Sequence, residues 1–321
     1  MKVAIIGGGG IVGSTAAYRI AQDGTVSEIL LVDARPNMAE AHALDIEQAI
    51  VRRAATRVRA GGIEDAKNSD VILVAVGAVA GPSQTSRGSF LEENIGTTMN
   101  LVRQLAVLSP RALWMIATIP VDAFVYLIHR HFSIPRSKVI GVNGNDTSRF
   151  RWAVAKTLSV PAPSVEAFVL GEHGETLVPV FSQIRVNKEI VALNSEQKKQ
   201  IRTSISDWLP NWVRLDSGRS AGWTTAECIG GVLVSMASGD DRAWACATPL
   251  DGEYGYRDIA FGVPVKMGPE GVKEIVEFDL TAEERKALNM SAEVIRKQIR
   301  QGSVLLEKGK PSTHPKKDIG S

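Results

Sequence analysis

The stretch KVAIIGGGGIVG, residues 2–13, decides the fold. KVAII is a short apolar run of the kind that forms a buried strand, and VGSTAAYRIAQ continues behind the glycines as a helical pattern. A glycine turn between a strand and a helix lets the backbone approach a pyrophosphate, and the start of the helix offers N–H groups to the phosphates. The G-x-G-x-x-G pattern therefore predicts a dinucleotide site, with contacts from Gly8, Gly10, Ile11, Val12 and Gly13.

A carboxylate follows the next apolar run, EILLVDA (28–34), and selects among dinucleotides. Asp33 lies twenty residues after Gly13, where it can accept hydrogen bonds from both ribose hydroxyls of NAD and repel the 2′-phosphate of NADP. Arg35, two residues later, weakens this preference. We predict NAD as the cofactor, with NADP as the alternative.

Strand-like and helical patterns alternate through the first half of the chain. Further apolar runs lie at 70–78, 112–118 and 138–142, and helical patterns lie between them at 89–108 and 122–132. This alternation is typical of a parallel sheet with helices on both faces. We therefore predict an α/β fold, in which a Rossmann-type doubly wound sheet forms an NAD-binding domain over residues 1–142.

Strands and helices are mixed after this point, which predicts an α+β catalytic and substrate domain over residues 143–306. Its expected helices lie at 147–158, 195–214, 220–238 and from a capping box at Thr281–Glu284 to about 301, and its expected strands lie at 165–170, 178–186, 244–250 and 259–267. The polar tail, 307–321, is expected to be disordered. The basic segment 51–62 is interpreted as a solvated helix end and loop rather than an anion site.

Composition and charge exclude several classes of function. The chain has 321 residues, 44% of them hydrophobic and 22% charged, as in soluble globular proteins. A net charge of +2 favours neither nucleic acid nor an anionic membrane as a partner, and no apolar run is long enough for a membrane span. The only cysteines, Cys228 and Cys246, are far apart, which predicts no metal site and favours the reducing cytoplasm.

GEHGE, residues 171–175, places a histidine where an apolar run ends. A histidine at such a turn is more often structural than catalytic, but Asp146 in GNDTSRFR is a candidate partner. A carboxylate bonded to one imidazole nitrogen fixes the tautomer, so that the other nitrogen can exchange a proton with a substrate hydroxyl. Arg149 follows on the same helical face, and its planar fork suits a substrate carboxylate. From spacing alone, an ordinary ion pair remains an equal alternative.

Together these blocks resemble the lactate/malate dehydrogenase family over residues 2–301. The family's catalytic dyad is an aspartate in D-x-x-R-F-R and a histidine in G-E-H-G-[DE], 27 residues apart, as Asp146 and His173 are. The resemblance implies that His173 is the general acid and base, that Asp146 orients it, and that Arg149 binds the substrate carboxylate. It also implies a homodimer or homotetramer.

The segment GAVAGPSQTSRGSF (77–90) resembles the family's mobile active-site loop. The resemblance implies that Gly77 and Asn94 contact the cofactor and that Arg87 polarises the reacting carbonyl. Gly81 stands where malate enzymes carry an arginine and lactate enzymes a glutamine, so a dicarboxylate is disfavoured. Ser83 or Gln84 could reach the same space.

Two further positions bear on the substrate. The opposite wall of the site is expected to come from GRSAGWTT (218–225), through Ser220, Ala221 or Thr225. The family motif N-P-V-D appears here with Ile119 in place of the asparagine that donates to the reacting oxygen. An aliphatic side chain cannot make that bond, and the side chain of Thr118 should point the other way along the strand. Slow turnover of ordinary 2-oxo acids, or an unusual substrate, is expected.

The sequence therefore predicts an NAD-dependent oxidoreductase that interconverts a 2-hydroxy acid and its 2-oxo acid by hydride transfer. Lactate-like monocarboxylates lead, malate dehydrogenase is the alternative, and a larger hydroxy acid is a third candidate. A non-catalytic NAD-binding homologue is favoured only by Ile119. A metal-dependent glycosidase on a related fold would need a cysteine–histidine metal pair, and neither Cys228 nor Cys246 lies in such a motif.

Overall fold

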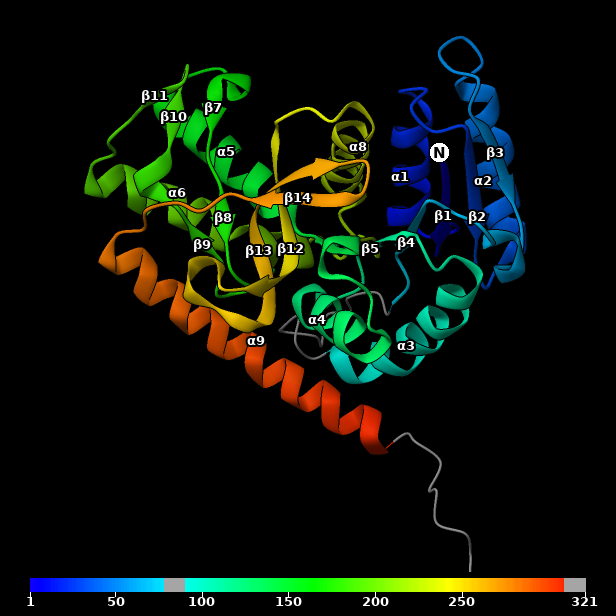
Figure 1. Cartoon of the computed structure of the whole chain (residues 1–321). Coiled ribbons are helices and arrows are strands. Elements are labelled where there is room, and N and C mark those ends of the chain that lie inside the picture. Colours follow the sequence, from blue (N-terminus) through cyan, green and yellow to red (C-terminus); the bar gives the residue numbers. More distant parts are fainter. Residues whose placement is uncertain (78–89, 309–321) are drawn as a thin grey trace, which may run out of the picture.

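The computed structural model describes residues 1–77 and 90–308. Its main feature is a nine-stranded sheet in the order β14-β13-β12-β6-β5-β4-β1-β2-β3 (Figure 1). The six parallel strands of this sheet are β1 (Lys2–Ile6), β2 (Glu28–Val32), β3 (Arg57–Ala60), β4 (Val71–Val74), β5 (Leu113–Ile116) and β6 (Val139–Val142). Their order, 3-2-1-4-5-6 when numbered along the parallel set, is that of a doubly wound nucleotide-binding sheet. The predicted fold class is confirmed.

The parallel strands form because their side chains are apolar at nearly every position, as burial on both faces requires. The strands β4, β5 and β6 are buried over their whole length, and β1 and β2 are buried in all but their first residue. β1 pairs with β2 on one side and with β4 on the other, so the strand order reverses at β1. Ligands of such sheets bind at the carboxyl ends of the strands beside this reversal.

The interpretation of residues 51–62 as loop is wrong at residues 57–60, which form β3 at the edge of the sheet. Only Val58 of this strand is buried, whereas Arg57 is exposed and Arg59 forms an ion pair with Glu28 of the neighbouring strand. An edge strand needs one apolar face only, and outward charges protect it from pairing with other chains. A single valine between arginines gives too weak an alternation to predict a strand.

Helices pack on this sheet in two groups. α1 (Ile11–Ala21) contacts α2 (Pro36–Ala49) and α8 (Gly222–Ser238), whereas α4 (Val121–Phe132) contacts α3 (Phe90–Leu108) and α9 (Ala282–Lys308). In Figure 1, α1 and α8 lie in the upper part of the view and α3, α4 and α9 in the lower part. The capping box predicted at the start of α9 is present, because Thr281 Oγ1 accepts from Glu284 N and Glu284 Oε2 accepts from Thr281 N.

The second half of the chain contributes to two structures. Three antiparallel strands return to the main sheet beside β6, namely β12 (Ala243–Asp251), β13 (Arg257–Gly268) and β14 (Gly271–Ile275). A smaller part, with its own apolar cluster around Phe150, Ile184 and Ile201, contains helices and very short strands. Its elements are α5 (Gly144–Leu158), α6 (Ser195–Ser206), α7 (Trp208–Arg214), β7 (Val165–Glu166), β8 (Val169–Leu170), β9 (Val178–Pro179), β10 (Arg185–Val186) and β11 (Glu189–Ile190).

Two predicted boundaries need correction. The final helix continues to Lys308 rather than ending near 301, so residues 307 and 308 are not part of a disordered tail. Leu305 and Leu306 pack against the main core, which extends the helix beyond the predicted end. The remainder of the predicted tail, 309–321, lies outside the described residues. Within the described part of the chain, no helix is both long and apolar enough to cross a bilayer.

Candidate active site

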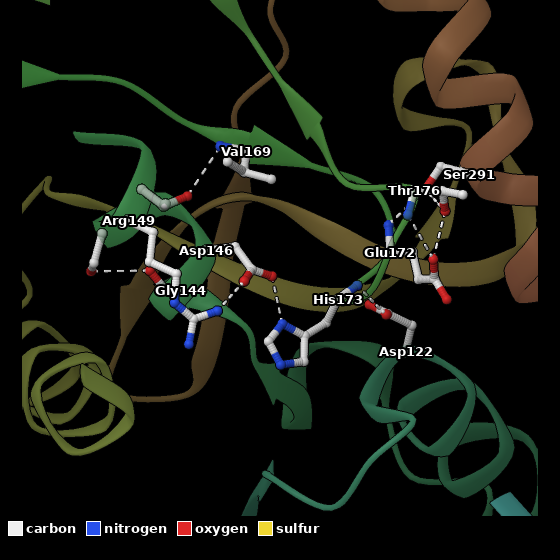
Figure 2. Close-up of polar contacts among 11 residues, drawn as sticks. Asp122, Gly144, Asp146, Arg149, Val169, Glu172, His173, Thr176 and Ser291 are labelled. Carbon is white, nitrogen blue, oxygen red and sulfur yellow. Dashed lines mark hydrogen bonds and ion pairs between the residues drawn. The ribbon is translucent and has the colours of Figure 1, made fainter. Parts of the chain in front are cut away.

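The GEHGE turn joins β8 to β9 and is built by its first glycine. Gly171 has a φ of +85°, and a Cβ on it would lie 2.5 Å from Ser291 Oγ of α9. Glu172 is buried and fixed toward α9, because Ser291 Oγ accepts from its backbone N (2.7 Å) and Gln298 Nε2 donates to its Oε1 (3.0 Å). The side chain of the next residue, His173, points to the other side of the turn, toward Asp146 (Figure 2).

Asp146 connects the histidine to the arginine of the predicted site. Its Oδ2 lies 2.6 Å from His173 Nδ1, and its Oδ1 accepts from Arg149 Nη1 at 2.8 Å (Figure 2). All three side chains are at least nine-tenths buried. An ionised carboxylate only accepts hydrogen bonds, so the His173 proton resides on Nδ1 and Nε2 carries the lone pair in the neutral ring. One carboxylate thus fixes the tautomer of the histidine and the direction of the guanidinium.

The contact between Asp146 and Arg149 follows from their place on α5. This helix begins at Gly144, three residues earlier than predicted, so Asp146 stands in its first turn. Arg149 follows at i+3, where side chains on a helix are neighbours. The negative charge of Asp146 at the start of the helix is also favoured by the helix dipole.

A second buried aspartate holds the histidine from its backbone. Asp122, in the first turn of α4, accepts a hydrogen bond from His173 N at its Oδ2 (2.7 Å) and is 1% exposed. Its Oδ1 has no hydrogen-bond partner among the described residues. Burial raises the pKa of Asp122 well above its ordinary value, and the charges of Glu172 and Asp146 add to this rise. The buried Asp122 carboxyl group therefore holds a proton more readily than an exposed aspartate does.

The predicted nucleotide contacts lie together at the carboxyl ends of β1 and β2. A Cβ on Gly13 would lie 2.2 Å from the carbonyl oxygen of Gly7, so only glycine allows this turn to close. No side chain caps the first turn of α1, and its leading N–H groups have no acceptor within the helix. Both features suit the approach of a pyrophosphate.

Asp33 is held in place beside this turn. Its Oδ2 accepts from Gly9 N and its Oδ1 from Arg35 N, both at 2.9 Å. The Arg35 side chain is 62% exposed and reaches back to the carbonyl oxygen of Gly9 at 3.3 Å. The residues present therefore fit NAD, with the carboxylate at the end of β2 and the glycine turn beside it.

Three further predicted residues meet at the ends of β4 and β5. Asn94 of α3 is buried and donates from Nδ2 to the carbonyl oxygen of Ile119 (2.9 Å). A Cβ on Gly77 would lie 3.2 Å from the Asn94 amide. The hydroxyl of Thr118 is already engaged, because it donates to the carbonyl oxygen of Val76 at 2.6 Å.

The remaining predicted residues fall elsewhere. Gly81, Ser83, Gln84 and Arg87 lie outside the described residues. Ala221 precedes α8, whose first residue, Gly222, lies against Ile11 and Thr15 of α1. The structure thus places Ala221 next to a residue that packs on the nucleotide-binding helix.

Sequence reasoning missed a tryptophan that touches the site. Trp208, the first residue of α7, lies face to face with Arg149, whose Cζ is 3.5 Å from the centroid of the indole ring. The pair WLPNW, with tryptophans at 208 and 212, was a sequence signal for an aromatic helix face, but nothing in the sequence linked it to Arg149. Asp122 was also not predicted, because nothing in the segment IPVD indicates a contact with the distant GEHGE turn.

Comparisons with known proteins give a consistent result. A family model for the lactate/malate dehydrogenase NAD binding domain matches residues 1–141, and one for the lactate/malate dehydrogenase alpha/beta C-terminal domain matches residues 145–305. The chain is 31% identical over 300 residues to a malate dehydrogenase of Halobacterium salinarum, covering 92% of this chain and 98% of that one. It is 32% identical over 309 residues to L-lactate dehydrogenase 3 of Bacillus cereus, with coverages of 92% and 96%.

A solved structure shares the architecture. The lactate dehydrogenase of Cryptosporidium parvum, complexed with lactic acid and β-nicotinamide adenine dinucleotide, superposes with a TM-score of 0.86 at 25% identity. The match covers 97% of this chain and 98% of that one. Both halves of the chain, and not the nucleotide-binding half alone, thus have counterparts in known proteins.

Proposed function

The chain belongs to the lactate/malate dehydrogenase family and uses NAD, and on this premise we propose that it interconverts a 2-hydroxy acid and its 2-oxo acid. One observation carries the proposal. Asp146 bonds both to Arg149 and to His173, so a carboxylate-binding fork and a proton-transfer group stand on either side of one acceptor (Figure 2). A 2-oxo acid has its carboxylate and its reactive oxygen on adjacent carbons. One molecule of this kind can therefore contact Arg149 and His173 at the same time, because Asp146 holds the two side chains close together.

In the direction of reduction, Arg149 binds the substrate carboxylate through two in-plane hydrogen bonds and sets the orientation of the neighbouring carbonyl. Bound NADH supplies the hydride. Protonated His173 gives its Nε2 proton to the carbonyl oxygen, which becomes the hydroxyl, and Asp146 stabilises the imidazolium from the Nδ1 side. In the direction of oxidation, neutral His173 takes the hydroxyl proton. Arg87 is proposed, from the family resemblance, to polarise the same oxygen.

For the substrate side chain we propose a lactate-like monocarboxylate. The support is Gly81, which offers no cation to a second carboxylate at the position where malate enzymes carry arginine. Malate is the second candidate, because relatives that match nearly the whole chain are named malate dehydrogenases. A 2-oxo acid with a larger side chain is the third, because glycine leaves room.

The test is turnover of NADH with pyruvate, oxaloacetate and a series of 2-oxo acids with longer side chains. At least one acid should be reduced, and His173→Asn should lower kcat/KM by about 10²–10⁴-fold while NADH still binds. His42→Asn, on α2, is the matched control and should leave the rate unchanged. If NADH binds but no acid is reduced by the parent, the chain is a non-catalytic NAD-binding homologue.

Three further properties are proposed. We propose a division into domains at residues 142 and 143, with β12–β14 returning to the first sheet. Both cysteines are buried free thiols, which supports a cytoplasmic location. A homodimer or homotetramer is proposed from family membership, and chromatography with light scattering would test it. Within the described ranges no group of three or more potential ligand side chains could hold a metal ion.

A further inference from the structure

Arg149 is held in two perpendicular directions. Within its plane, Nη1 donates to Asp146 Oδ1 at 2.8 Å, and across its plane the indole of Trp208 lies 3.5 Å from Cζ. Trp212 stacks behind Trp208, with ring centroids 5.2 Å apart and an angle of 16° between the ring planes. The three side chains form a continuous stack that joins α5 to α7.

This stack restricts how a substrate can reach the guanidinium. Carboxylates bind a guanidinium in its plane, through parallel N–H donors, whereas aromatic rings bind its face. Because Trp208 occupies one face, Arg149 can tilt toward that side only by losing the indole contact. Because Asp146 occupies one in-plane edge, rotation within the plane is also limited. The plane in which a substrate carboxylate must lie is therefore fixed before substrate arrives.

We propose, on the basis of the function proposed above, that Trp208 is a positioning residue that fixes Arg149 for edge-on binding of a single substrate carboxylate. The proposal extends to the class of substrate. The indole presents an apolar surface beside the clamp, which disfavours a second carboxylate on that side of Arg149. A 2-oxo acid with one carboxylate and an uncharged side chain therefore fits this wall better than a dicarboxylate does.

The placement of α7 supports a specific role for the tryptophan. Asp207 alone separates α6 from α7, so Trp208 stands at the junction of the two helices. The ring is partly buried against Arg149, whereas Trp152 and Trp223 are 53% and 63% exposed. Trp208 contacts Arg149, which in turn donates a hydrogen bond to Asp146.

The test compares Trp208→Leu, which removes the aromatic face, with Trp208→Phe, which keeps one. Trp152→Leu, on the same helix as Arg149 but exposed, is the matched control. The probe is oxamate, which carries one carboxylate beside a carbonyl group, added to the NADH-saturated protein. Trp208→Leu should raise the Kd of oxamate and the KM of the best 2-oxo acid about tenfold, with a smaller change in kcat. Trp208→Phe should recover most of the affinity.

Tryptophan fluorescence supplies a second measurement that does not depend on the leucine variant folding. Oxamate should change the emission of the parent and of Trp152→Phe, and this change should be absent in Trp208→Phe. An unchanged oxamate Kd and KM in Trp208→Leu, or an oxamate response retained in Trp208→Phe, would overturn the positioning role. If instead the parent neither binds oxamate nor reduces any 2-oxo acid, the proposed function fails. Reduction of oxaloacetate in preference to every monocarboxylate would overturn the proposed substrate class alone.

Discussion

Two buried aspartates touch His173, and the same substitution should lower activity far more at one of them than at the other. Asp146 accepts from the imidazole ring at 2.6 Å, whereas Asp122 accepts from the backbone N at 2.7 Å. Only the ring contact distinguishes the protonated from the neutral histidine. Asp146→Asn replaces the anionic acceptor by an amide of the same shape, so that the imidazolium loses its charge-assisted hydrogen bond. Asp122→Asn keeps a carbonyl oxygen for the backbone bond and leaves the contact between Asp146 and the imidazole ring in place.

The size of the effect follows from the bond that is lost. A hydrogen bond to a charged group contributes about 1.5–3 kcal/mol, which corresponds to about a ten- to 150-fold loss of kcat/KM in Asp146→Asn. In Asp122→Asn the loss should stay within about threefold, because the amide oxygen can still accept the hydrogen bond from His173 N. Initial rates of NADH oxidation with the best 2-oxo acid measure both, and NADH titration shows that the cofactor site is intact. Equal losses in the two variants, or a larger loss in Asp122→Asn, would refute the assignment of Asp146 as the partner of the ring.

Four more predictions test separate parts of the structure. Arg149→Lys keeps the charge but not the planar fork, so the KM of the 2-oxo acid should rise about tenfold or more with an unchanged Kd for NADH; an unchanged KM contradicts the clamp. Asp122 has a raised pKa in the folded protein, so the unfolded chain loses this proton at a lower pH than the folded protein does. The free energy of unfolding of the parent should therefore fall by about 1.4 kcal/mol per pH unit above about pH 4, until the carboxyl of the folded protein ionises. Melting curves of Asp122→Asn between about pH 4 and pH 7 should lack this contribution, and parallel curves for the two proteins would show that Asp122 is ionised. Asp33→Asn should shift the kcat/KM ratio about tenfold toward NADPH, and a ratio that stays constant removes Asp33 from the cofactor site. Gly13→Ala places a Cβ against the carbonyl oxygen of Gly7 and should cost about 1–3 kcal/mol in thermal denaturation, whereas an unchanged melting temperature would mean that the turn is looser than described.

Local patterns predicted the parallel sheet because its strands are buried on both faces and therefore read as continuous apolar runs. KVAII, with the glycine turn behind it, identified β1 and the start of α1 within one residue. The arrangement of Asp146 and Arg149 could also be predicted, since three residues along a helix make neighbours. Where burial is confined to one residue, as at Val58 of β3, the sequence carried no comparable signal.

The features that depend on distant parts of the chain could not be predicted. The stack of Trp208 on Arg149 is a tertiary contact between α5 and α7, and no periodicity within either helix encodes it. The raised pKa of Asp122 results from its burial, and the charges of Glu172 and Asp146, which come from other elements, add to it. The return of β12–β14 to the first sheet likewise depends on pairing between β12 and β6, far apart in sequence.

We propose that hydride passes between NAD and the carbon next to a substrate carboxylate, with His173 moving the proton. The most direct measurement uses NADH carrying deuterium at the transferred position, together with the best 2-oxo acid, and mass spectrometry of the product. We predict one deuterium, bound to the carbon that carries the new hydroxyl, and a loss of this product in His173→Asn. A product without deuterium, or the same yield from His173→Asn as from the parent, would contradict it.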